Sequence, residues 1–516
     1  MTTETKTLSW TNFVRENAFL LGLALIKLFV HFAVNARDSV FRDELYYIAC
    51  GKHLAFGYVD HPPFVALMAA LSRWFLGDSI FALRLSSAIA GAAMVFITGL
   101  LAREMGGKRF AQNLAALCAL LAPIYLGIDS FFSMNAFDQL FWLLGAYLLV
   151  LLIKRESRGL WVTFGVVMGL GLMNKISLLF FGFGLSIGIL LTPNRRWLLK
   201  PWIWISGGIA FLIFIPHILW QMANGWPTLE FIRNASQYKN ASLSPWEFVK
   251  AQIVLAHPLM LPIWLAGLLR LFFHREEKPF RLLGWIYIAA MIVFILNNGK
   301  PYYLAPAYTF LFAAGAIVFE NGIDALRKPW LKPVLCAVLI TGGALTAPMA
   351  LPILPSDMFI RYNQILGIEA PREENHEMGV LPQFFADRYG WREMTEAIAE
   401  VYNRLPPDER RECAIIAGNY GQAGAIDYFG PSLGLPNAVC GHNNYFLWGP
   451  GDKSGDIAIV YGHSREDCEK SFESVEQAAI FTHPYVMPYE NNKSIFICRK
   501  IKKPIQELWP QIKRYI

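Results

Sequence analysis

The sequence predicts an α-helical polytopic membrane protein with about eleven transmembrane helices, followed by a C-terminal α/β domain. Three observations lead to this fold class. Of the 516 residues, 55% are hydrophobic and only 16% are charged, whereas soluble proteins carry about 25% charged residues. Apolar stretches long enough to cross a bilayer recur through the first two thirds of the chain. After about residue 350, they give way to shorter runs that alternate with polar segments.

Each apolar stretch of about 17 to 25 residues is a candidate membrane span. The first is long and lacks a convincing small-residue cleavage site, so it is expected to remain as an anchor and not to be removed as a signal peptide. The fifth is short, and its boundary is the least certain. The expected spans are 17–35, 80–101, 110–127, 136–153, 160–173, 176–192, 202–222, 251–269, 282–297, 303–319 and 333–350.

Basic residues predict the orientation of these spans, because Lys and Arg near span ends are retained on the cytoplasmic side. Five basic clusters fall in alternate loops, on the side of the N-terminus. We therefore expect the N-terminus inside a bacterial cytoplasmic membrane, with loop 36–79 and residues 351–516 outside. The clusters are Arg103, Lys108 and Arg109; Lys154, Arg155 and Arg158; Arg195, Arg196 and Lys200; Arg275, Lys278 and Arg281; and Arg327, Lys328 and Lys332.

The net charge of +7 does not indicate a nucleic-acid partner. The basic residues lie in these short loops, and no stripe of alternating basic and aromatic residues follows them. The partner implied by so many spans is the lipid bilayer itself.

The region after residue 350 is expected to form a small extracytoplasmic α/β domain. Segments 413–418, 457–461 and 495–498 have the pattern of buried strands, and 391–404 has that of an amphipathic helix. Glycines 418, 421 and 424 lack the spacing of a phosphate-binding loop and are expected to lie in turns. Export would permit disulfides in this region, although buried free thiols are the alternative. Its cysteines are Cys413, Cys440, Cys468 and Cys498.

The first outward loop, 36–79, carries the most unusual polar residues. Asp43 and Glu44 follow the first span. Segments 44–56 and 63–76 are expected to form amphipathic helices at the membrane surface, and Asp60 and His61 precede the two prolines that open the second helix. Two carboxylates in succession suit acid–base chemistry, but neighbouring side chains on a helix diverge, so only one is expected to face a reaction. A solvated helix start is the alternative interpretation.

The other outward loops also place charges at or inside span ends, where ionisable groups are costly unless they face a wet cavity or each other. Each alone could be a structural charge. Their common side of the membrane favours a shared cavity. These residues are Asp129, Asp138, Lys175, Arg233, Lys239 and Lys300, the last followed by Tyr302 and Tyr303.

Several motifs together resemble the dolichyl-phosphate-mannose protein mannosyltransferase superfamily, and within it the bacterial branch that includes the lipid A aminoarabinose transferases. They are DELYY (43–47), HLAFGYVDHPP (53–63), MNAFD (134–138), GLMNK (171–175), WQMANGWPTLE (220–230) and GKPYY (299–303), with GQAGAIDYFG (421–430) and GHNNYFLWG (441–449) further along. The resemblance implies the GT-C membrane fold over 1–350, a polyprenyl-phosphate sugar donor and an extracytoplasmic active site.

The chemistry of such a transfer assigns roles to these residues. Asp43, matching the Asp of the family's acidic pair, is the expected general base. Lys300, with Lys175 or Arg233 and with Tyr302 and Tyr303 nearby, is expected to bind the donor phosphate. A single base predicts inversion at the anomeric carbon; retention would require a second, nucleophilic carboxylate, for which Glu44 and Asp138 remain candidates.

The substrate pocket is expected to include Asp60, His61, Asp129 and Asp138. Asp60 and His61 are also competent metal ligands, but two adjacent side chains rarely form a site alone, so contact with sugar or phosphate is the default expectation for His61. A divalent metal is therefore possible but is not required.

The alternative function is a flippase or transporter of the lipid-linked sugar, although the sequence has no internal repeat of the kind common in transporters. The sequence leaves open the sugar, the carrier length, and whether the acceptor is lipid A, another glycan or a protein.

Overall fold

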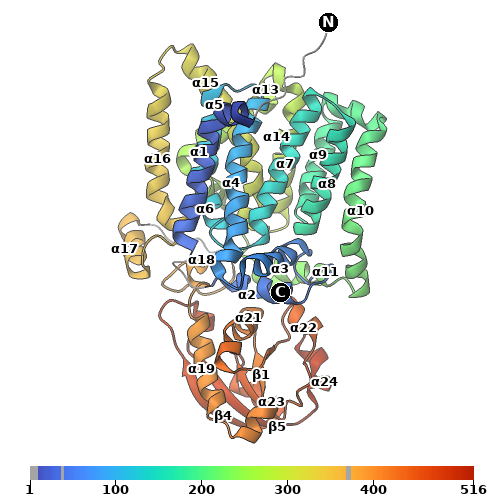
Figure 1. Ribbon diagram of the computed structural model, residues 1–516, viewed down its shortest axis with the longest axis vertical. Coiled ribbons are helices and arrows are strands. Elements are labelled where there is room, and N and C mark those ends of the chain that lie inside the picture. The colour runs from blue at the N-terminus through green and yellow to red at the C-terminus, as the bar shows by residue number, and fades with distance from the viewer. Residues whose placement is uncertain (1–9, 36–39, 368–373) are drawn as a thin grey trace.

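The computed structural model describes residues 10–35, 40–367 and 374–516, so residues 36–39 of the predicted outward loop lie outside the described residues. Long helices occupy the chain as far as Ala350, and a smaller mixed region with a β-sheet lies at one end of this bundle (Figure 1). The helices α2 (Arg42–Lys52), α3 (Phe64–Leu76) and α11 (Pro227–Asn234) lie between the two parts.

The bundle is built mainly from apolar helices. Its members are α1 (Trp10–Asn35), α4 (Ile80–Glu104), α5 (Arg109–Leu121), α6 (Pro123–Ile128), α7 (Met134–Lys154), α8 (Arg158–Asn174), α9 (Leu178–Leu190), α10 (Pro201–Ala223), α12 (Pro245–Leu255), α13 (Leu261–Phe273), α14 (Arg281–Leu296), α15 (Tyr308–Ala325) and α16 (Leu331–Ala350).

Within the described residues, seven helices are long and apolar enough to cross a membrane, or up to nine if each of two bent pairs is one span. The chain is thus a multi-pass membrane protein, but the expected count of eleven is not confirmed. The difference arises partly at α5 and α8, which have only 13 and 17 residues. A helix rises about 1.5 Å per residue, so both are shorter than a full bilayer crossing of about 30 Å.

The outer helices face lipid with their apolar side. In α10 the buried residues are Ser206, Ala210, His217 and Gln221, whereas large side chains such as Phe211 and Leu212 are exposed. A water-soluble helix would have the reverse pattern. Small and polar residues on the buried side are typical of helix packing in membranes.

The C-terminal region contains a mixed five-stranded sheet in the order β2-β1-β3-β5-β4. β1 (Ala414–Ala417) is parallel to both β2 (Ala438–Val439) and β3 (Ile457–Tyr461), whereas β5 (Lys493–Ile501) is antiparallel to β3 and to β4 (Phe472–Phe481). The register pairs Ile415 with Ile459 and Ile459 with Ile497, so apolar residues continue across the sheet. The strands expected from sequence coincide with β1, β3 and β5.

Short helices surround this sheet and connect it to the bundle. The predicted amphipathic helix is α19 (Trp391–Asn403), which packs against β4 and α21 (Tyr420–Phe429). The C-terminal cysteines are buried free thiols, and Cys468 and Cys498 share one small apolar cluster. The remaining helices are α17 (Ser356–Leu366), α18 (Gln383–Ala386), α20 (Pro407–Glu412), α22 (Asn444–Trp448), α23 (Arg465–Ser471) and α24 (Ile505–Leu508).

Candidate active site

A cavity of about 540 Å³ lies where the helix bundle meets the C-terminal region. Its polar lining comes from α2, from the π-helical turn Ala235–Lys239, from the 3₁₀ helix Pro301–Ala307 and from the C-terminal region. Its apolar lining comes from the bundle and includes Ile124, Phe180, Val254 and Val293. The cavity therefore offers charged groups and an apolar wall side by side.

Asp43 lines this cavity from the first turn of α2. Its Oδ1 accepts a hydrogen bond of 2.9 Å from the hydroxyl of Tyr420, the first residue of α21. The neighbouring Arg42 guanidinium lies 4.6 Å from the centre of the Tyr420 ring and donates to the Tyr489 hydroxyl at 3.1 Å. The C-terminal region thus fixes both side chains at the start of α2.

Glycines 421 and 424 allow this approach of α21 to α2. A Cβ at position 421 would lie 2.7 Å from Cγ of Arg42, and one at position 424 would lie 2.9 Å from Cβ of Leu45. Neither distance is compatible with a larger residue unless the helices separate. Gly421 and Gly424 thus lie within α21 and not in turns as the sequence suggested, and their lack of a side chain permits this helix packing.

Glu44 has a different position from its neighbour and does not line the cavity. It is fully buried, and its two carboxylate oxygens accept hydrogen bonds of 2.7 and 2.8 Å from Arg84. They also accept from the backbone N–H groups of Phe132 and Phe41 at 2.7 and 2.8 Å. Successive residues on a helix are rotated by about 100°, which directs Asp43 into the cavity and Glu44 into the protein. This position does not support a place for Glu44 among the reacting groups.

Three lysines supply positive charge to the cavity. Lys300 forms an ion pair of 2.5 Å with Glu374, and Lys239 lies 4.0 Å from the same carboxylate. Lys175 lies 3.6 Å from Asp138 and donates to Oδ1 of Asn135 at 2.7 Å. All three line the cavity.

Two aromatic residues accompany Lys175. Its ammonium nitrogen lies 4.7 Å from the centre of the Tyr303 ring and 5.9 Å from that of Tyr302, and both rings line the cavity. Arg233, by contrast, is exposed in the last turn of α11 and does not line it. The π-helical turn after α11 brings Lys239 to this position instead.

Of the adjacent residues Asp60 and His61, both expected in the pocket, the first lines the cavity and the second lies behind it. Asp60 lines the cavity and accepts a hydrogen bond of 2.8 Å from the Tyr46 hydroxyl; burial raises the pKa of its carboxyl. His61 is fully buried behind it, with Nδ1 2.8 Å from the Pro62 carbonyl oxygen, and burial lowers the pKa of its ring. Direct contact of His61 with a ligand in the cavity is not supported by this position.

Asp129 and Asp138 also lie outside the cavity lining. Asp129 forms a fully buried ion pair of 2.8 Å with Lys27 of α1. Asp138 is buried and accepts from Ser177 at 2.9 Å as well as pairing with Lys175. Within a membrane, such charges are stable because they are paired with each other and not because they face water.

Among the described residues, no three His, Cys, Asp or Glu side chains are close enough together to hold a metal ion. Asp60 and His61 therefore lack a third protein ligand from this set. The side chains that do converge are carboxylates, lysines, Arg42 and tyrosines, which suit proton transfer and phosphate binding.

Several lining residues were absent from the expected site. Tyr420, Glu374 and Asp387 come from the C-terminal region, where the sequence suggests only a separate domain. Burial raises the pKa of Asp387 to about 7, although Arg42 opposes this shift. Tyr420 directly precedes the GQAGAIDYFG motif, and this motif is the feature of the sequence from which a role for Tyr420 in the site could have been predicted. Glu374 and Asp387 lie outside any recognisable motif, so the sequence does not predict that they line the cavity.

Comparison with known proteins agrees with this architecture. The family model described as dolichyl-phosphate-mannose-protein mannosyltransferase matches residues 60–220. Lipid A galacturonosyltransferase RgtD of Rhizobium johnstonii is 22% identical over 325 residues, which cover 62% of this chain and 67% of that protein. An undecaprenyl phosphate-α-4-amino-4-deoxy-L-arabinose arabinosyl transferase of Serratia proteamaculans is 25% identical over 325 residues, or 58% of this chain. The match spans only 56% of that relative's length.

Solved structures extend the similarity of fold to nearly the whole chain. ArnT from Cupriavidus metallidurans bound to undecaprenyl phosphate superimposes with a TM-score of 0.58 at 16% identity, covering 95% of this chain and 98% of ArnT. The apo state of the same protein gives a TM-score of 0.58 at 15% identity, with coverage of 93% and 97%. The family match over residues 60–220, the two sequence relatives and the solved structures thus agree: the chain is similar to this family over part of its length, and its fold is similar to that of ArnT over nearly all of it.

Proposed function

We propose that this membrane glycosyltransferase transfers a sugar from a polyprenyl-phosphate carrier to an extracytoplasmic glycolipid of the lipid A class. One observation carries the proposal: Asp43 and the ammonium groups of Lys175, Lys239 and Lys300 line a single cavity that also has an apolar wall from the bundle. Such a cavity suits a charged headgroup attached to a lipid tail. The relatives named for lipid A and for an undecaprenyl-phosphate sugar support the choice of acceptor and donor.

In the proposed reaction, Asp43 removes the proton from an acceptor hydroxyl as its oxygen attacks the anomeric carbon. The bond between that carbon and the phosphate oxygen breaks, and polyprenyl phosphate leaves with the bonding electron pair. The lysines stabilise the charge that develops on the leaving phosphate. The hydroxyl of Tyr420 holds the Asp43 carboxylate in position for the proton transfer.

We propose inversion at the anomeric carbon. Retention through a covalent intermediate requires a nucleophilic carboxylate beside the sugar. Glu44 and Asp138, the candidates for that role, are outside the cavity lining and have buried partners of their own. Their positions favour a single displacement with Asp43 as the base.

We further propose that the cavity and the sheet face the outside of the cytoplasmic membrane, because the five basic clusters predict the opposite side to be cytoplasmic. Asp456 is an exposed residue just before β3 and is suitable for a reporter cysteine. In Asp456→Cys, a membrane-impermeant thiol reagent should label intact spheroplasts. Labelling only after permeabilisation would refute the orientation.

Transfer itself is tested with purified protein in liposomes that contain a labelled polyprenyl-phosphate sugar, with lipid A and without it. The proposal predicts that label moves to lipid A only when protein and acceptor are both present. Movement of the intact labelled carrier across the bilayer without transfer would favour the flippase alternative. Transfer to a protein but not to lipid A would refute the acceptor class.

A further inference from the structure

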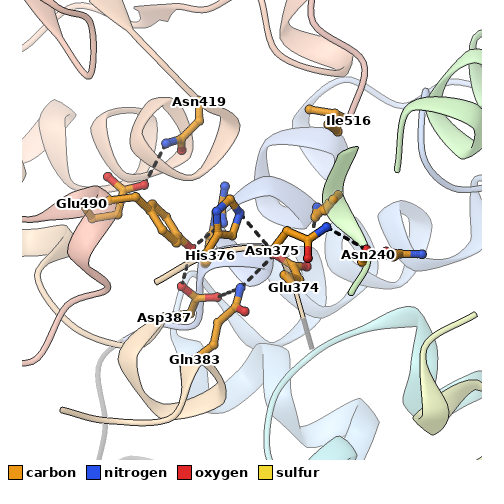
Figure 2. A network of polar contacts seen from close by, with 12 residues as sticks. Asn240, Glu374, Asn375, His376, Gln383, Asp387, Asn419, Glu490 and Ile516 are labelled. Atoms are coloured by element: carbon orange, nitrogen blue, oxygen red, sulfur yellow. Dashed lines mark hydrogen bonds and ion pairs between the residues drawn. The ribbon is translucent and has the colours of Figure 1, made fainter. Parts of the chain in front are cut away.

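A short segment of the C-terminal region, residues 374–376, lies beside Asn240 (Figure 2). Its Glu374 lines the cavity, as do Lys239 and Lys300. Glu374 forms an isolated antiparallel bridge with Asn240. The backbone N–H of Asn375 donates to the Lys239 carbonyl at 3.0 Å, and its side-chain amide donates to the Asn240 carbonyl at 3.0 Å. A few hydrogen bonds, partly exposed, thus attach this segment to the loop after α11.

The Glu374 carboxylate lies among the groups proposed to bind phosphate. Oε1 is 2.5 Å from the Lys300 ammonium and 4.0 Å from that of Lys239, and Oε2 accepts from Gln383 at 3.2 Å. Burial alone would raise the pKa of Glu374, but the two lysines together lower it to about 2. Glu374 is therefore an anion at neutral pH, and it already lies against the two ammonium groups proposed to bind the phosphate.

The described lining of the cavity carries as many carboxyl groups as cationic side chains. Among the described lining residues, the carboxylates are Asp43, Asp60, Glu374 and Asp387, and the cations are Arg42, Lys175, Lys239 and Lys300. A phosphodiester donor adds one negative charge. Burying an extra charge without a partner is costly, so donor phosphate and Glu374 compete for the same ammonium groups.

We propose that Glu374 is a resident anion of the empty phosphate site and that the phosphate of the polyprenyl-phosphate donor displaces it together with residues 374–376. This inference rests on the proposed function. The carboxylate keeps Lys239 and Lys300 neutralised before the donor arrives, which avoids a buried repulsion between them. Release breaks the ion pairs of Glu374 with Lys239 and Lys300 and the hydrogen bonds of Asn375, and the donor phosphate replaces the carboxylate as the partner of both lysines.

The first test measures binding of undecaprenyl phosphate to the purified full-length protein and to Glu374→Gln. The amide keeps the shape of the side chain but removes the competing charge, so the variant should bind about tenfold more tightly than wild type. Glu377→Gln is the matched control, because Glu377 is exposed three residues further along the same segment and does not line the cavity. It should bind as wild type does.

The second measurement is hydrogen–deuterium exchange of residues 374–376 in wild-type protein, which remains informative if Glu374→Gln is poorly folded. Addition of undecaprenyl phosphate should increase exchange at the Asn375 amide, whose bond to Lys239 breaks on displacement. Binding to wild type with no gain in Glu374→Gln, or with stronger protection of Asn375, would overturn the displacement while leaving the proposed function intact. Absence of binding to wild type would overturn both.

Discussion

Buried acidic residues occur in two parts of this molecule, and their surroundings differ. Against the bundle helices, Glu44 of α2 pairs with Arg84 of α4 and Asp129 pairs with Lys27 of α1, and all four side chains are completely inaccessible. At the junction with the C-terminal region, Asp43 and Glu374 line the cavity, and their partners are Tyr420 and the lysines. The first group consists of fully buried ion pairs with bundle helices, whereas the second joins residues far apart in the sequence around the cavity.

The difference in surroundings distinguishes carboxylates that stabilise the fold from carboxylates that are accessible to a substrate in the cavity. Glu44 uses both oxygens on Arg84 and two backbone amides, so no oxygen is left to accept a proton from a substrate. Asp43, one residue earlier, accepts a hydrogen bond from the Tyr420 hydroxyl through Oδ1 and lines the cavity. Adjacent carboxylates of the same motif therefore have different functions, and each of the following changes tests that division.

The largest effect on stability is expected for Glu44→Gln. Removing one charge of a fully buried pair leaves Arg84 uncompensated, which costs about 3–5 kcal/mol. Thermal unfolding in detergent should reveal this loss. Glu104→Gln is the control, since Glu104 pairs with Lys154 at a partly exposed position and such pairs contribute about 1 kcal/mol or less. Equal melting temperatures for both variants would contradict a structural role for Glu44.

The next effect is on binding of the carrier phosphate. Lys300→Ala removes an ammonium group from the proposed phosphate site. Binding of undecaprenyl phosphate should weaken by about 2–5 kcal/mol, because the ion pair between Lys300 and the phosphate is largely desolvated. Lys250→Ala is the control, since Lys250 is exposed on α12 and does not line the cavity. Unchanged binding in Lys300→Ala would remove Lys300 from the phosphate site.

The smallest effect is a pH dependence caused by Asp387. Burial, with the nearby carboxylates Asp43 and Glu374, raises its pKa to about 7, so Asp387 is mainly neutral below that pH and becomes negative above it. The donor KM should therefore rise as the pH increases through about 7. In Asp387→Asn this dependence should disappear, as measured by transfer kinetics between pH 6 and pH 8. A wild-type KM that falls over this range would contradict the assignment.

Much of the fold follows from the sequence because long apolar runs and alternating strands have strong local patterns. Segments 202–222 and 457–461 coincide with α10 and β3 for this reason. The number of complete spans was not predictable from the sequence. The helix α5 is too short for a full crossing, and α12 and α13 form a bent pair. The sequence shows how long an apolar stretch is, but it does not show the angle between two helices that follow one another.

The candidate site was predictable only in part. Asp43, Lys175, Lys300 and the two tyrosines lie next to distinctive motifs, and the structure brings them to one cavity. Glu374, Asp387 and Tyr420 enter through packing of the C-terminal region on α2, which depends on the tertiary contact at glycines 421 and 424. Local patterns carry no information about such a contact between residues separated by more than 300 positions.

The central claim, that Asp43 is the base of the transfer reaction, is tested most directly by single-turnover transfer in Asp43→Asn with donor binding measured on the same preparation. The amide preserves shape but cannot take a proton, so the rate should fall about 10²- to 10⁴-fold while undecaprenyl phosphate still binds. A rate equal to that of wild type, with the same donor occupancy, would contradict the claim.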